Sequence, residues 1–230
     1  MPLLVCLLPI VFLSSAIRIE MNSLGLYTRG FETYQVSTTT GLSDNQLEQA
    51  ASTLIRYFNS LAGSPQVVVT HANGSQFDLF HDYELIHLAD VRILFAINAA
   101  VQSISLLLVV AFALAGLSFG RRDDVYKGLR YGAAATLALL VTSAVAFLTN
   151  FNQMFVAFHL VAFDNPFWQL NPLTDYLVML FPLGFWQDMF LIAGASTGLG
   201  AIATYTSVAL ASRAARRTPR RGAVPNQHKR

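Results

Sequence analysis

The feature that most constrains this chain is a run of 27 residues, 93–119, that contains no charged side chain. About 20 apolar residues are enough for a helix to cross the hydrocarbon core of a bilayer, roughly 30 Å thick. Only 12% of the chain is charged, with a mean hydropathy of +0.48, whereas soluble domains carry about twice that charge. The sequence therefore predicts an integral membrane protein and excludes a soluble globular domain.

Three further apolar runs accompany this one. Residues 131–151 and 189–212 are also uncharged, and residues 1–17 form a shorter apolar stretch. The short first run also fits the hydrophobic part of a signal peptide, but no positively charged leader precedes it, which favours a retained helix. We therefore predict four transmembrane helices, at 1–17, 93–119, 131–151 and 189–212.

The distribution of charge predicts how these helices are oriented. Residues 120–130 and 213–230 together hold 11 of the 15 Lys and Arg residues and only two of the 13 acids. Because basic residues near membrane spans stay on the cytoplasmic side, we expect a cytoplasmic loop at 120–130 and a basic cytoplasmic tail at 213–230. Both termini are then cytoplasmic, and residues 18–92 and 152–188 are outside. The basic tail is typical of a topology anchor that also binds anionic lipid, so no nucleic-acid partner is expected.

The outer segment 18–92 is long enough for a small folded unit. Ser43 or Asp44 caps a helix with one apolar face, and a Val-rich strand, 66–70, is followed by an Asn-Gly turn and an alternating segment, 76–80. These are typical signals of an amphipathic helix and a β-hairpin. The predicted fold is an all-α integral membrane core of four transmembrane helices with a small α+β extracytoplasmic domain.

Two histidines are placed by this topology at the same membrane face. His87 precedes the second span and His159 follows the third, so both are expected at the outer surface. Glu84 and Asp90 lie three residues on either side of His87, which puts both carboxylates on its side of a helix. A neighbouring carboxylate fixes the tautomer of an imidazole and raises its basicity, as a general base requires.

The segment 152–188 is too polar and proline-rich for a plain span and too aromatic for a solvated loop. We expect it to lie along the membrane interface, with its Trp side chains at headgroup depth. An aromatic belt explains Trp168 without further function, but it does not require His159, Asn165 and Asp175 among the aromatic residues. Ionisable groups at membrane depth usually mark a functional site.

Two groups of residues resemble the signatures of a known family. The first comprises Phe80, Glu84, His87, Asp90 and Val91; the second comprises Phe158, His159, Phe163, Asn165, Trp168, Leu170, Pro172, Asp175, Pro182 and Phe185. With this spacing, the chain resembles the bacterial lipoprotein intramolecular transacylases, four-span membrane proteins, over residues 20 to 210.

The resemblance implies a reaction on the diacylglyceryl-modified N-terminal cysteine of a lipoprotein. In this reaction the sn-2 acyl chain moves from its ester oxygen to the cysteine's own α-amino group, which gives the lyso form. The resemblance implies that His87 and His159 are catalytic. By resemblance and position, Glu84, Asp90 and Asp175 are candidates to orient them, and Asn165 and Trp168 are candidates to donate to the oxyanion. It also implies the bacterial cell membrane as the location, a lipoprotein N-terminus and membrane lipid as partners, and neither cofactor nor metal.

The chemistry of the residues agrees with this implication. An α-amino group with a pKa of about 8 must lose a proton before it attacks an ester, and an imidazole with a pKa of about 6.5 suits that task. No Ser or Cys stands beside a histidine as a nucleophile, which favours direct transfer over an acyl-enzyme.

Two other functions remain open from the sequence. One is a metal-dependent membrane hydrolase in which His87, His159, Asp90 and Asp175 surround zinc, since three protein ligands and an open position suffice for catalysis. The other is a non-enzymatic lipid-binding membrane protein, which would tolerate histidine substitution but not loss of its aromatic surface.

Overall fold

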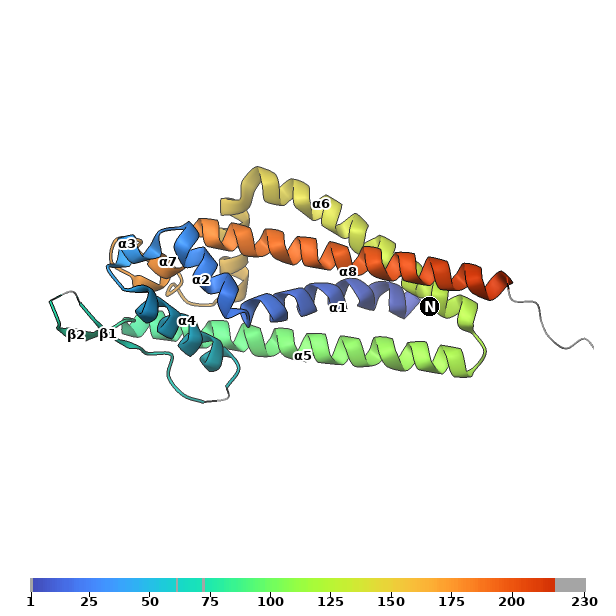
Figure 1. Ribbon diagram of the computed structural model, residues 1–230, viewed down its shortest axis with the longest axis horizontal. Helices are drawn as coiled ribbons and strands as arrows, with labels where there is room; N and C mark the ends of the chain where they lie inside the picture. Colours follow the sequence, from blue (N-terminus) through green and yellow to red (C-terminus); the bar gives the residue numbers. More distant parts are fainter. Residues whose placement is uncertain (1, 61, 72, 218–230) are drawn as a thin grey trace, which may run out of the picture.

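The structure is a computed structural model that describes residues 2–60, 62–71 and 73–217. Four long helices run along the long axis of the molecule, and several short elements gather at one end (Figure 1). The long helices are α1 Pro2–Met21, α5 Asp82–Ser118, α6 Arg122–Ala162 and α8 Leu183–Arg217. Each contains a stretch long and apolar enough to cross a membrane, which confirms the predicted number of four. The predicted basic tail lies outside the described residues from position 218 onward.

The first helix lies inside the bundle. α1 packs against α5, α6 and α8, and Figure 1 shows it between α5 and α8. Polar side chains join it to α5: the Asn98 amide donates to the Ser14 carbonyl oxygen at 3.1 Å, and Arg18 donates to Gln102 Oε1 at 2.8 Å. In an apolar environment such bonds satisfy polar groups that lipid cannot.

A glycine sets the spacing between α1 and α6. A Cβ atom added at Gly132 would lie 2.8 Å from the Leu4 carbonyl oxygen and 2.7 Å from Leu8 Cδ1. We expect Gly132→Val to destabilise the bundle by about 1–3 kcal/mol through overpacking, measured as a lower thermal unfolding temperature in detergent. The control is Gly194→Val on α8, where an added Cβ meets no atom within 4 Å. Equal melting temperatures for the two variants would contradict the close approach.

The second long helix extends well beyond the predicted span. α5 begins at Asp82, eleven residues before position 93, because His81 and Glu84 form a capping box at its start. The Glu84 carboxylate accepts a hydrogen bond from the His81 amide at 2.8 Å. His87 is therefore held on a continuous helix that enters the bundle.

The third long helix is sharply bent. Asn150, with φ −150° and ψ 48°, interrupts the helical backbone of α6. In Figure 1 the first part of α6 diverges from α8, and the chain then turns and passes back across it. Residues 151–162, which belong mostly to the predicted interfacial segment, are thus a second helical part of α6. The sequence analysis did not predict this helix.

The short elements surround one hydrophobic core at the end of the bundle. They are α2 Leu24–Thr33, α3 Val36–Thr40, α4 Asp44–Phe58, β1 Val68–Thr70, β2 Gln76–Asp78 and α7 Tyr176–Leu180. The structure has both the helix predicted after Ser43, which begins with a capping box, and the antiparallel hairpin, in which Val69 faces Phe77. Leu54 of α4 and Phe185 of α8 are buried in this shared core, which fixes the short elements to the long helices.

Candidate active site

The two histidines predicted at the same membrane face lie face to face in the structure. The ring centroids of His87, on α5, and His159, in the second part of α6, are 6.0 Å apart, and the ring planes differ by 30°. Each residue is 7% exposed. Their meeting depends on the bend at Asn150, which carries residues 151–162 back across the bundle.

The hydrogen bonding of His159 defines its tautomer. Its Nδ1 lies 2.7 Å from the Phe155 carbonyl oxygen, which only accepts hydrogen bonds, so Nδ1 carries the proton. The Nε2 atom is then left with a free lone pair. Burial lowers the pKa of His159, and the bond to the Phe155 carbonyl opposes this only in part. The ring is therefore a neutral base at pH 7.

The hydrogen bonding of His87 differs from that of His159. Its Nδ1 atom is buried and has no hydrogen-bond partner among the residues that the structure describes. Leaving a buried polar atom unpaired costs about 1–3 kcal/mol, and such atoms in native structures often have a functional reason. His87 can therefore form a hydrogen bond with a molecule bound beside it.

Aromatic side chains enclose the histidine pair. The Phe163 ring makes an edge contact with His87, with the ring centroids 4.8 Å apart. The ring centroid of His159 lies 4.3, 5.3 and 5.1 Å from those of Phe155, Phe158 and Trp168, respectively. Because both histidines are buried, electrostatic interactions between them are stronger than in water. The structure thus places Trp168, predicted from sequence, directly beside the second histidine.

Asp90 and Asn165 are brought together near the pair. Asn165 Nδ2 donates to Asp90 Oδ2 at 2.7 Å, and Asn165 Oδ1 accepts from the Phe167 amide at 3.1 Å. This pairing fixes the loop after α6 to α5, one helical turn beyond His87. The hydrogen bond that the Asn165 amide donates is therefore with Asp90, and its predicted role at the oxyanion stays a prediction.

The hydrogen bonds described for Glu84 and Asp175 involve neither His87 nor His159. The fully buried Glu84 carboxylate accepts from the His81 and Leu177 amides at 2.8 and 2.7 Å. Asp175 accepts from Tyr83 Oη at 2.8 Å. These contacts join the start of α5 to α7.

The ionisation of Asp175 follows from its contacts. Burial acts to raise the pKa of this carboxyl, but hydrogen bonds from the Asn171 amide, Thr174 and Tyr83 hold it below its ordinary value. Asp175 is therefore an anion that anchors this loop. Tyr83 was not predicted as part of the site, because its partner is 92 residues away in the sequence.

The ligand set of the metal alternative does not converge. In the parts of the chain that the structure describes, no three His, Cys, Asp or Glu side chains are placed to hold a metal ion. Asp175 instead accepts hydrogen bonds from Tyr83, Thr174 and Asn171. A zinc site built from His87, His159, Asp90 and Asp175 is therefore not supported by this geometry.

Comparisons with known proteins agree with the geometry. The family model described as lipoprotein intramolecular transacylase Lit matches residues 2–186. A search of curated proteins gave no match. A solved structure of the membrane integral lipoprotein intramolecular transacylase Lit from Bacillus cereus has a TM-score of 0.80 at 17% identity, covering 94% of this chain and 95% of that one.

Two further structures of the Bacillus cereus protein carry a substituted histidine. The form with alanine has a TM-score of 0.75 at 16% identity, and the form with arginine has 0.70 at 17%. Both alignments cover 94% of this chain and 93% of the other. At these identities the likeness establishes a shared fold.

Proposed function

This chain belongs to the lipoprotein intramolecular transacylase family, and from that premise we propose that His87 and His159 together catalyse the acyl transfer. The α-amino nitrogen of a diacylglyceryl-cysteine attacks the carbonyl carbon of its own sn-2 ester. A carbon–nitrogen bond forms, the ester carbon–oxygen bond breaks, and one proton passes from nitrogen to the glyceryl oxygen. The observation that carries the proposal is the pair of buried rings 6.0 Å apart inside an aromatic enclosure.

The tautomer of His159 supports a division of labour. His159 Nε2 accepts the proton of the attacking amine, because its Nδ1 proton is committed to the Phe155 carbonyl. His87, whose Nδ1 is unpaired among the described residues and whose ring faces His159, relays that same proton to the leaving glyceryl oxygen, so both rings end neutral. General acid and base catalysis of this kind contributes about 10²- to 10⁴-fold. Holding amine and ester in one bound lipid contributes much of the remaining acceleration.

The arrangement of the helices supports a site at the outer membrane face. The start of α1, the connection between α5 and α6, and the end of α8 lie at one end of the molecule, and the short elements lie at the other (Figure 1). The connection and the segment after α8 are rich in basic residues, which favours a cytoplasmic location for that end. The short elements then form the extracytoplasmic domain, and the histidine pair faces the outer leaflet of the bacterial cell membrane.

The ionisation of His159 can be tested directly. Because burial lowers its pKa below the ordinary 6.5, the neutral base is present at pH 7 and is lost as the pH falls through that lowered value. Nitrogen-15 NMR of histidine-labelled protein should show a His159 titration midpoint below 6.5 and the Nδ1-protonated tautomer. A midpoint above 6.5 would contradict the assignment of His159 as the base.

The function is tested in a bacterium whose lipoproteins keep a free α-amino group. Expression of this protein there should yield lipoproteins with one acyl chain on the glyceryl group and one on the cysteine nitrogen, located by tandem mass spectrometry. Lipoproteins that keep both chains on the glyceryl group, despite membrane insertion of this protein, would overturn the proposal. That result would favour the lipid-binding alternative.

A further inference from the structure

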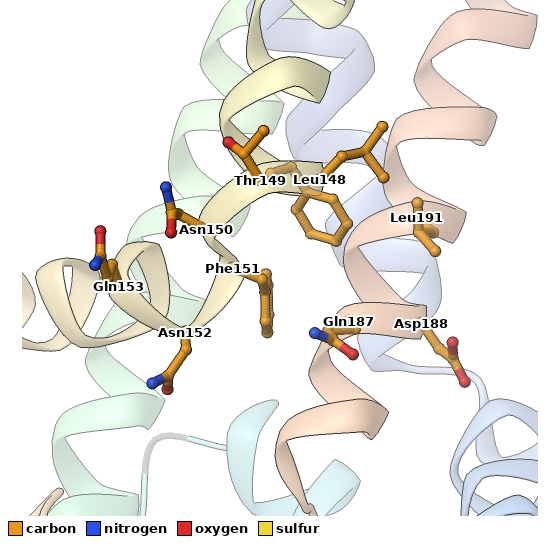
Figure 2. A pocket seen from close by; sticks show the side chains of 10 residues that line it. Leu148, Thr149, Asn150, Phe151, Asn152, Gln153, Gln187, Asp188 and Leu191 are labelled. Carbon is orange, nitrogen blue, oxygen red and sulfur yellow. The ribbon is translucent and has the colours of Figure 1, made fainter.

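A cavity lies where α6 diverges from α8. It has a volume of about 540 Å³; residues 147–153 of α6, around the bend, form one wall, and Gln187, Asp188 and Leu191 of α8 form the other. Figure 2 shows Phe151 between the two walls, with Gln187 and Asp188 on α8 across from the bend at Asn150. The described contacts of the histidine pair do not include the residues of this cavity.

The surroundings of the cavity indicate contact with lipid. At its rim, Leu148 is 74% exposed and Leu191 is 52% exposed, as expected of side chains that face acyl chains. A broken helix at membrane depth is tolerated only where it is buried in protein or lines a polar cavity. The bend at Asn150 with its amide side chains therefore makes a polar opening beside an apolar surface.

The cavity carries one negative charge. Asp188 is its only charged lining residue, and Tyr34 Oη donates to its carboxylate at 2.9 Å. Within the described ranges, the ion pairs are His81 with Glu84 and Arg121 with Asp124, so Asp188 has no cationic partner there. A carboxylate near the membrane is costly unless something neutralises it. The cavity is therefore suited to a ligand with a positive charge.

An aromatic row connects this cavity with the histidines. Phe147, Phe151, Phe155 and His159 follow one another at intervals of four residues, with successive ring centroids 4.9, 6.0 and 4.3 Å apart. Phe147 and Phe151 line the cavity, and Phe155 contacts His159. The row gives an apolar surface along which acyl chains can pass from one site to the other.

We propose that this cavity is the docking site for the charged N-terminus of the lipid-anchored substrate, and the inference rests on the proposed function. Asp188 binds the α-ammonium group of the diacylglyceryl-cysteine, which at neutral pH is mostly protonated since its pKa is about 8. The amide side chains of Asn150, Asn152 and Gln187, which both donate and accept, face the ester and peptide groups next to it. The amine then moves along the aromatic row and loses its proton at the histidines.

The test compares two synthetic diacylated lipopeptides, one with a free α-amino group and one N-acetylated, which lacks the charge. Binding of fluorescent forms is measured in the His87→Ala background, so that the ligand is not consumed. We expect the His87→Ala variant to bind the lipopeptide with the free amine about tenfold more tightly than the N-acetylated one. Adding Asp188→Asn should remove this preference, because it weakens binding of the free-amine lipopeptide only. Tyr34→Phe is the matched control: it removes the hydroxyl donor but keeps the carboxylate, so the preference should remain.

Three outcomes overturn the inference. If Asp188→Asn weakens the binding of both lipopeptides equally, Asp188 only supports the structure. An unchanged preference means that the amine binds elsewhere. If vesicles of phosphatidylethanolamine compete with the fluorescent lipopeptide as strongly as unlabelled lipopeptide does, while vesicles of phosphatidylglycerol do not compete, the cavity holds a lipid headgroup. Failure of the proposed function is seen separately, because it appears as absence of acyl transfer by the unaltered protein.

Discussion

Replacing either His87 or His159 by alanine is expected to lower the rate of acyl transfer by at least about 10²-fold, the contribution typical of one general acid or base. The two ring centroids are 6.0 Å apart and both rings are buried, so a substrate bound beside the pair needs both rings to move one proton from its nitrogen to its oxygen. The measurement is the fraction of lipoprotein with an acylated cysteine nitrogen, quantified by mass spectrometry. The double variant should be little worse than either single variant, because the residues act as a unit.

The matched control is His71→Ala. His71 is exposed and stacks on Phe77 of β2, with ring centroids 3.9 Å apart, and it lies outside the aromatic enclosure. This variant should keep full activity, and all variants should remain in the membrane fraction. Full activity of His87→Ala or His159→Ala would refute the proposed chemistry, and a large loss in His71→Ala would indicate that the assay reports damage to the fold.

Glu84→Ala is expected to cause the largest loss of stability. Glu84 is 0% exposed, and its loss leaves the buried Leu177 amide and the partly buried His81 amide without their acceptor. Each buried group left unpaired costs about 1–3 kcal/mol, so the free energy of unfolding should fall by about 2–5 kcal/mol. For a chain of 150–250 residues this corresponds to a drop in melting temperature of roughly 4–20 °C, measured by intrinsic fluorescence in detergent.

Two further variants separate the hydrogen bonds from the charge. Glu84→Gln keeps one acceptor oxygen and the volume of the side chain, so it should recover part of the loss. Glu48→Ala removes an exposed carboxylate from α4 and should change stability by less than about 0.5 kcal/mol. A melting temperature for Glu84→Ala equal to that of Glu48→Ala would show that the α5–α7 junction does not depend on this carboxylate.

Features that depend on short stretches of sequence could be predicted without the structure. Four membrane-crossing helices follow from the length and hydropathy of single segments, since each must cover the bilayer by itself. The start of α4 was predicted with Ser43 or Asp44 as its cap, and the structure has Ser43, whose capping box with Gln46 lies within four residues. The hairpin was predicted from Asn73-Gly74, which joins β1 and β2. In each case all interacting residues are close in the chain.

Features that depend on distant partners were predicted less well. Helical spacing placed Glu84 on the same side of α5 as His87. In the structure the buried Glu84 carboxylate accepts a hydrogen bond from the Leu177 amide, 93 residues away in the sequence. Asp175 similarly binds Tyr83. The bend at Asn150 was missed because no proline or glycine marks it.

The sequence by itself determined that the chain spans a membrane, and it placed His87 and His159 at the same face, because hydropathy and positive charge act locally on each segment. Only the tertiary structure decided that the two rings lie 6.0 Å apart, that Phe155 fixes the tautomer of His159, and that an anionic cavity opens beside α8. The physical reason is that these features arise from one bend in α6 and from packing between helices. Neither is specified by the hydropathy of a single segment.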